Sequence, residues 1–409
     1  MNYPAGDSYA SNVKAIGYCD LDGKPGFKLA LHQAGDRWYL YTAKFWHPGF
    51  SIVEVTDPAN PRLVKFIEGP SNTWTLQVQI ADGKMITSQE KIMEGWGNTP
   101  GQEYGEGFLI WDLADPENPE LQGHFKTNGD GTHRNYYDGG RYVYATGLPA
   151  GYVGQILQIV DIVDPKNPIE VGRWWRPGQW EAGGESGARI GTMLHGGAYV
   201  KGDRAFLPYG AGGFVILDIS DKTKPTMISD LPFSPPFVNF ISVHTAVPLK
   251  GRDLVVVNSE AIKENCEEPL GYCGIVDVSD ETNPHLISLF PLPVPPDDAP
   301  YRNFCERGGR FGPHNQHQPQ NQDILYQGED LSFVTYFNGG LRIYDISDER
   351  LPQEVGYFLP PDPRERRGLL PASKLVAQTE DVIVDNRGNI FISDKNHGIY
   401  VLRFDGLNP

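Results

Sequence analysis

An apolar strand that runs into an aspartate, a short polar turn and a proline recurs six times along this chain. The turn aspartates follow one another about every 50–70 residues, which is the period expected of a four-stranded propeller blade. The copies read SIVEVTDPANP (51–61), FLIWDLADPENP (108–119), LQIVDIVDPKNP (157–168), FVILDISDKTKP (214–225), GIVDVSDETNP (274–284) and LRIYDISDERLP (341–352).

The chemistry of each copy favours a strand followed by a tight turn. An aspartate at the end of an apolar run can cap backbone N–H groups, and the proline that follows restricts φ. Helical periodicity is not evident between the copies, where short apolar or alternating runs are separated by Gly, Pro, Asn and Asp. The sequence therefore predicts an all-β chain, with the turn aspartates in a structural role.

Aligning the repeats predicts one domain, a seven-bladed β-propeller covering residues 1–409. The last copy lacks an outer strand, and NVKAIGYCD (12–20) matches the missing pattern. We therefore expect the N-terminal strand to complete the last blade and close the ring, which removes exposed sheet edges. The expected blades are about 27–69, 74–127, 132–177, 193–234, 241–293, 312–359 and 374–405 plus 12–20.

The repeats resemble those of the LVIVD-repeat family, whose name describes the strand that reads LQIVDIVD or GIVDVSD here. The resemblance covers nearly the whole chain and implies a seven-bladed propeller. It implies little about activity, because a propeller is a scaffold that supports many unrelated chemistries.

The formal net charge of −17 argues against nucleic acid or an anionic membrane as a partner, because both require a basic surface. A small-molecule substrate is the expected partner, and the oligomeric state stays open. No apolar run approaches a membrane helix, and MNYPAGDSYASNV lacks the features of a signal peptide. These observations predict a cytoplasmic protein, although a removed signal peptide and a periplasmic location would leave the same sequence.

Four cysteines do not make a disulfide scaffold. Cys266 and Cys273 flank a short insertion, so a bridge between them is one expectation for an oxidising compartment. Unpaired thiols are the other expectation.

Three histidines share one register. His133, His195 and His244 each precede the second strand of a blade by nine or ten residues, which places them at the start of the innermost strand. That position borders the central channel of a propeller, and His314 is the preferred fourth member, ahead of His317. Four converging imidazoles would hold one transition metal ion, with Fe favoured and Zn, Mn or Cu as alternatives. The arrangement is similar, in geometry alone, to the four-histidine iron centre of carotenoid cleavage oxygenases.

Other side chains are expected around this centre. Glu260 and Glu380 are candidates to orient a ligand imidazole and to act in catalysis, and Arg134 could bind an anionic substrate group. A further set lies at blade starts or in turns that open on the same face, and is expected to line a substrate pocket: Trp46, His47, Trp74, Gln77, Tyr209, His317, Tyr336, Phe337 and His397.

Two functions fit these observations. The preferred hypothesis is a metal-dependent enzyme, an Fe-dependent oxygenase or oxidative C–C cleaving enzyme on a small aromatic or apolar substrate, with a Zn- or Mn-dependent hydrolase or lyase as the alternative. The competing hypothesis is a non-catalytic propeller that serves as a platform for proteins or ligands. In that case the histidines are structural, since a histidine at a strand start can simply bond a neighbouring carbonyl.

Overall fold

The structure of the protein is a computed structural model, which describes residues 8–185, 187–232 and 240–407. Antiparallel strands dominate these residues, and the helices are short: α1 (Phe304–Arg307) and the 3-10 turns η1 (Leu21–Gly23) and η2 (Glu181–Gly183). None of the helices described is long and apolar enough to cross a membrane. The all-β prediction is confirmed, whereas residues 1–7, to which the signal-peptide prediction partly refers, lie outside the description.

The chain forms two compact units, which we describe separately. The first unit combines Met1–Gly69, Ala261–Tyr272 and Ser288–Pro409, and the second combines Pro70–Glu260 and Cys273–Ile287.

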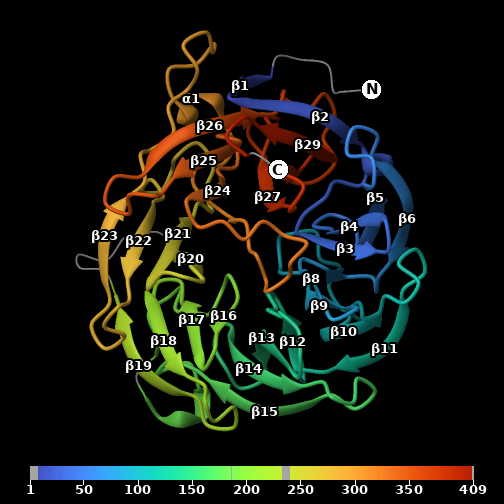
Figure 1. The fold of residues 1–409 in the computed structure, drawn as a ribbon. Coiled ribbons are helices and arrows are strands. Elements are labelled where there is room, and N and C mark those ends of the chain that lie inside the picture. The colour runs from blue at the N-terminus through green and yellow to red at the C-terminus, as the bar shows by residue number, and fades with distance from the viewer. Residues whose placement is uncertain (1–7, 186, 233–239, 408–409) are drawn as a thin grey trace. The chain divides into compact units, whose positions relative to one another are not determined.

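The first unit contains sheets of four strands (Figure 1). One sheet has the order β3 (Leu29–Ala34), β4 (Arg37–Ala43), β5 (Gly49–Glu54), β6 (Arg62–Glu68). A second has the order β1 (Tyr9–Ser11), β26 (Gln353–Leu359), β25 (Leu341–Asp345), β24 (Leu331–Thr335). A third has the order β2 (Val13–Cys19), β29 (Ile399–Phe404), β28 (Asn389–Asp394), β27 (Thr379–Val384).

The third sheet joins the two ends of the chain. Strand β2 runs antiparallel to β29, with Val13 opposite Phe404 and Cys19 opposite Ile399. Figure 1 shows the blue N-terminal strand beside the red C-terminal sheet. The predicted pairing of the N-terminal strand with the C-terminal strand of the chain is therefore confirmed.

The second unit also consists of consecutive antiparallel strands. One sheet has the order β16 (Tyr199–Lys201), β17 (Arg204–Pro208), β18 (Phe214–Asp218), β19 (Thr226–Leu231), and another β20 (Ile241–Pro248), β21 (Leu254–Glu260), β22 (Cys273–Asp277), β23 (His285–Leu289). A larger sheet links β7 (Thr73–Trp74), β8 (Val78–Ala81), β9 (Lys84–Lys91), β10 (Gly107–Asp112) and β11 (Glu120–Phe125) to β12 (Gly129–Thr132), β13 (Tyr142–Pro149), β14 (Ile156–Asp161) and β15 (Ile169–Trp174).

Strand β9 makes the link within the larger sheet. It extends beyond its partner β8, and its last residues pair with β7 and β12 instead. Glu90 lies at this junction, opposite Trp74 on one side and Gly131 on the other. The two blades expected at about 74–127 and 132–177 are thus joined by backbone pairing, which the repeat alignment did not predict.

The turns after the third strand of each repeat have the predicted structure. In the first copy, Asp57 accepts the Ala59 backbone N–H at 3.0 Å and the Asn60 side-chain N–H at 2.7 Å. Asp115 and Asp164 make the same pair of contacts in their turns. The apolar strands before these turns are buried, so the repeat combines a core strand with a surface turn.

The cysteine pairing differs from the expectation. Cys266 forms a disulfide with Cys305, whereas Cys273 is a buried free thiol, as is Cys19. Cys273 opens strand β22 and is fixed inside the sheet, while α1 brings Cys305 to a Cα–Cα distance of 5.4 Å from Cys266. The expected bridge from Cys266 to Cys273, which was based on their proximity in the sequence, is therefore wrong.

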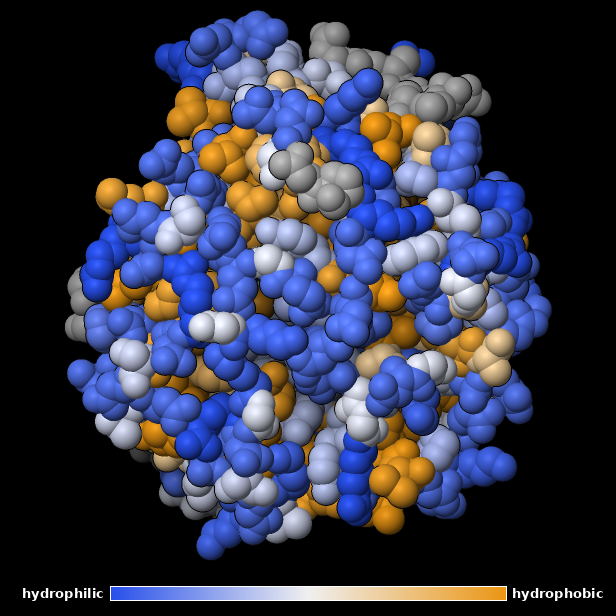
Figure 2. Space-filling model, viewed as in Figure 1, coloured by the Kyte–Doolittle hydropathy of each residue, from blue (hydrophilic) through white to orange (hydrophobic). Residues whose placement is uncertain are grey.

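Hydrophilic residues cover most of the face shown in Figure 2, with apolar groups visible between them.

Candidate functional site

Two of the predicted histidines and Glu260 meet in the second unit. His195 precedes β16. The residue before it, Leu194, donates its backbone N–H to the carbonyl of Gln155 at 3.0 Å, and Gln155 directly precedes β14. His244 lies in β20, where the pairing with β21 is irregular between Ile241 and Thr245. Such an irregularity changes the direction of side chains, which in a regular strand point alternately to the two faces of the sheet.

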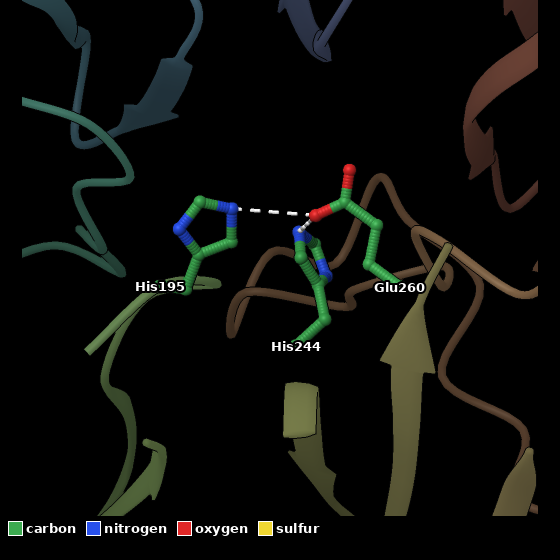
Figure 3. A group of neighbouring side chains, drawn as sticks. All are labelled: His195, His244 and Glu260. Carbon is green, nitrogen blue, oxygen red and sulfur yellow. Dashed lines mark ion pairs between the residues drawn. The ribbon is translucent and has the colours of Figure 1, made fainter. Parts of the chain in front are cut away.

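The imidazoles of His195 and His244 both approach the same carboxylate oxygen of Glu260 (Figure 3). Glu260 Oε2 lies 3.3 Å from His195 Nε2 and 3.5 Å from His244 Nε2. The three potential ligand atoms lie within 4.8 Å of one another. His244 is fully buried and Glu260 is 5% exposed, so little solvent reaches the group.

The electrostatics favour a neutral His195. Burial lowers the pKa of His195, and the neighbouring His133 and Arg134 lower it further, against the opposing effect of Glu260. A neutral imidazole is the form that binds a metal ion. In the part of the chain that the structure describes, His195 Nδ1 has no hydrogen-bond partner, which leaves Nε2, on the Glu260 side, as the nitrogen that the site uses.

Gly196 allows the backbone at His195 to approach His244. A Cβ atom at Gly196 would lie 1.5 Å from the His244 carbonyl oxygen, a distance that real structures do not tolerate. The glycine is therefore required if the two imidazoles are to reach the same carboxylate.

His133 lies beside this group but outside it. Its ring stacks on that of His195, with 4.5 Å between centroids and 29° between planes. Its Nδ1 is 2.6 Å from Glu90 Oε2, and both side chains are buried. Sequence reasoning missed Glu90, because only the pairing of β9 with β12 brings it to His133.

The remaining predicted ligand, His314, belongs to the first unit. Its Nδ1 lies 3.2 Å from Glu380 Oε2, and its ring stacks on Phe337 at 4.7 Å. Lys395, which sequence reasoning also missed, contacts the other carboxylate oxygen of Glu380. A shared site of His314 with the three histidines of the second unit stays a prediction.

The Lys395 ammonium is buried in an aromatic environment. It lies over the rings of Phe27, Phe45 and Phe337 at 4.8–5.5 Å, and 2% of its side chain is exposed. Burial alone would raise the pKa of Glu380, but the charge of Lys395 and the hydrogen bonds from His314 and Lys395 lower that pKa to about 2. Glu380 is thus held as an anion.

The predicted pocket residues of the first unit have varied surroundings. His317 uses both ring nitrogens on the backbone, Nε2 on the Tyr326 carbonyl and Nδ1 on the Val384 N–H, which favours a structural role. His397 lines a cavity of about 160 Å³ together with Tyr18 and Arg367.

Four further members of that set lie in the same unit. His47 is half-buried, and burial, Lys44, Lys24 and Arg367 lower its pKa. Trp46 donates its indole N–H to the Lys395 carbonyl at 3.0 Å, while Tyr336 and Phe337 are buried in the core.

The predicted pocket residues of the second unit are also buried. Tyr209 donates its hydroxyl to Gln179 at 2.6 Å within the core, which indicates a packing role. Gln77 donates to the Asn135 carbonyl at 3.1 Å, and Trp74 packs edge-on against Trp96. Arg134 is 2% exposed and follows His133 directly.

Comparison with known proteins supports the fold. The family model for the LVIVD repeat matches residues 151–175, 198–231 and 328–359, so the chain carries LVIVD repeats in a propeller-like, all-β structure. No curated protein matches the sequence.

Solved structures resemble the chain in fold alone. The computationally designed Ika8 protein is 8% identical, with a TM-score of 0.51 over 95% of this chain and 99% of that one. A protein from Lactobacillus plantarum is 11% identical, with a TM-score of 0.53 over 87% of this chain and 98% of that one.

Proposed function

We propose that the protein is a metal-dependent enzyme whose ion is held by His195, His244 and Glu260. The observation that carries this proposal is the convergence of three ligand atoms within 4.8 Å in a nearly closed environment. Buried polar groups at such distances are normally paired with hydrogen-bonding partners or a metal.

The donor set suggests the kind of ion. Two imidazoles and one carboxylate form the facial triad of non-haem Fe(II) oxygenases, and also the His₂Glu set of catalytic zinc sites. Both classes leave coordination positions open for water, O₂ or substrate. We therefore propose an Fe-dependent oxygenase or oxidative C–C cleaving enzyme on a small aromatic or apolar substrate, with a Zn- or Mn-dependent hydrolase or lyase as the alternative.

The proposal places this centre in a seven-bladed ring, where the repeat period and the β2–β29 pairing support closure. Arg134 would face an anionic substrate group beside His195.

Elemental analysis of untagged protein tests the proposal. We expect about one transition metal per chain, which His195→Ala, His244→Ala and Glu260→Ala should each remove. His285→Ala is the matched control, because that imidazole is 58% exposed and lies at a distant strand start. Wild-type protein that is folded and metal-free after incubation with Fe²⁺, Zn²⁺ or Mn²⁺ would refute it.

The second candidate function is a non-catalytic, metal-free platform for proteins or ligands. The distances between the imidazoles and the Glu260 carboxylate are compatible with it. Separations of 3.3 and 3.5 Å between imidazole and carboxylate also describe ion pairs, if the histidines are protonated. The lowered pKa of His195 argues against that state at neutral pH. An unchanged melting temperature on adding each metal would favour the platform.

The disulfide between Cys266 and Cys305 is relevant to the cellular compartment in which the protein folds. Disulfides persist in oxidising compartments and are rare in the cytoplasm of most cells. Because Cys266 and Cys305 are bridged, we propose the periplasmic alternative over the cytoplasmic one. Thiol trapping in intact cells tests this, since two additional alkylated cysteines would indicate a reduced, cytoplasmic protein.

A further inference from the structure

The pair formed by Glu90 and His133 has a defined geometry beside the proposed ion site. The two side chains are joined at 2.6 Å, and only 3% of Glu90 and 10% of His133 is exposed. Neither residue belongs to the group of ligand atoms that lie within 4.8 Å of one another. The pair therefore calls for a role other than that of a ligand.

The backbone holds this pair in place. Gly131 has φ +102°, and a Cβ atom there would lie 2.0 Å from the Gln89 carbonyl oxygen. This glycine lets β12 approach the end of β9, where Gly131 pairs with Glu90. His133 follows β12 and donates its backbone N–H to the Thr146 carbonyl at 2.9 Å. Both side chains are thus positioned by strands.

The contact with Glu90 determines which nitrogen of His133 carries hydrogen. A carboxylate only accepts hydrogen bonds, so Nδ1 must be the donor in a neutral imidazole. Nε2 then carries the lone pair. The His133 ring is stacked on that of His195, with 4.5 Å between centroids, and His195 Nε2 faces Glu260, so the His133 imidazole lies directly beside a proposed ligand of the ion.

We propose that His133, oriented by Glu90, is a hydrogen-bond acceptor for a hydroxyl group bound at the open side of the ion, and is not itself a ligand of the ion. The ligand class is a small molecule with a hydroxyl group, such as a phenol, or water in its absence. Glu90 is a positioning residue in this scheme. The inference rests on the proposed metal centre.

The first measurement separates a ligand from an acceptor. Wild type and the His133→Ala, Glu90→Gln, His195→Ala and His285→Ala variants are loaded with Co²⁺, and bound cobalt is counted. We expect about one Co²⁺ in wild type, His133→Ala, Glu90→Gln and His285→Ala, and none in His195→Ala. Loss of cobalt from a folded His133→Ala protein would make His133 a ligand and overturn the inference, while cobalt-free wild type would instead overturn the metal centre on which it rests.

The second measurement detects the hydrogen bond. Phenol is titrated into the Co²⁺ proteins and followed by the visible cobalt spectrum, with anisole as the probe that lacks a hydroxyl. We expect His133→Ala to bind phenol about tenfold more weakly, the loss typical of one hydrogen bond, with no change for anisole. Equal phenol affinity in wild type and His133→Ala would refute the acceptor role.

The third measurement concerns Glu90 and needs no metal. Histidine ¹⁵N shifts report which ring nitrogen is protonated. We expect His133 to be protonated at Nδ1 in wild type and to be a mixture of tautomers in Glu90→Gln, because an amide can donate as well as accept. A purely structural role for Glu90 would leave the tautomer unchanged, and that result would reject it as the positioning residue.

Discussion

Replacing Lys395 with methionine should strongly destabilise the protein, because it leaves the Glu380 anion buried without its cation. Lys395 and Glu380 are 2% and 0% exposed, and Asp381 pairs with Lys28 next to them. Breaking a buried pair by removing one partner costs about 3–5 kcal/mol.

The pKa of Glu380 leads to a similar magnitude. That pKa is about 2 in the folded chain, against 4.5 for an ordinary glutamate. At about 1.4 kcal/mol per unit, the difference corresponds to about 3 kcal/mol of stability. Because the folded-state pKa is the lower one, this contribution is complete above about pH 4.5 and is lost as the pH falls toward 2.

Urea unfolding of five proteins at several pH values tests the reasoning: wild type, Lys395→Met, Glu380→Gln, the double variant and Lys14→Met. Lys395→Met should lose about 3 kcal/mol at pH 7, and the double variant with Glu380→Gln should lose clearly less than the sum of the two single losses. Lys14→Met, at an exposed position, should stay within about 0.5 kcal/mol of wild type.

Two results would refute this account. One is a Lys395→Met protein as stable as the Lys14→Met control. The other is equal acid sensitivity of wild type and Glu380→Gln between pH 4.5 and 2, because Glu380 would then contribute nothing to the pH dependence.

Two further predictions concern the disulfide and the glycine between the histidines. Cys266→Ser should lower the melting temperature by about 5 °C, because closing a loop over a sequence separation of 39 contributes about 4 kcal/mol; calorimetry with and without a reductant measures this, and a wild type insensitive to reduction would contradict it. Gly196→Ala should lower metal affinity at least about tenfold by displacing His244, since its Cβ would overlap the His244 carbonyl. Gly187→Ala is the control, because a Cβ there meets nothing within 4 Å, and equal metal affinity of the two variants would show that the close approach is unimportant.

The fold was predictable where it depends on local chemistry. The turn aspartate, its Asx contacts and the proline act within a few residues, so each copy of the repeat could be interpreted separately. The β2–β29 pairing was predictable because the last repeat lacked one strand and the N-terminus matched its pattern. The disulfide was not predictable, because it depends on how two insertions fold against each other.

The candidate site was predictable only in part, for the same reason. The shared register of His195 and His244 indicated their convergence, and Glu260 was identified as a partner that would orient an imidazole. The structure instead brings its carboxylate oxygen within 4.8 Å of an imidazole nitrogen of each histidine, the arrangement of a potential ligand. The register did not place these histidines at strand starts as expected, because His244 lies inside β20 and His133 follows β12. It also does not give the direction of a side chain at an irregular pairing such as that around His244.

Glu90 shows what sequence periodicity omits. It lies near the end of β9, and no repeat position marks it. Its contact with His133 arises only because β9 extends beyond β8 and pairs with β12. The only local signal is Gly131, which a regular strand would not need and which permits the close approach of the two strands. A glycine with a positive φ two residues before a candidate site histidine, as Gly131 is before His133, is therefore a reason to search the preceding strands for a carboxylate that contacts the imidazole.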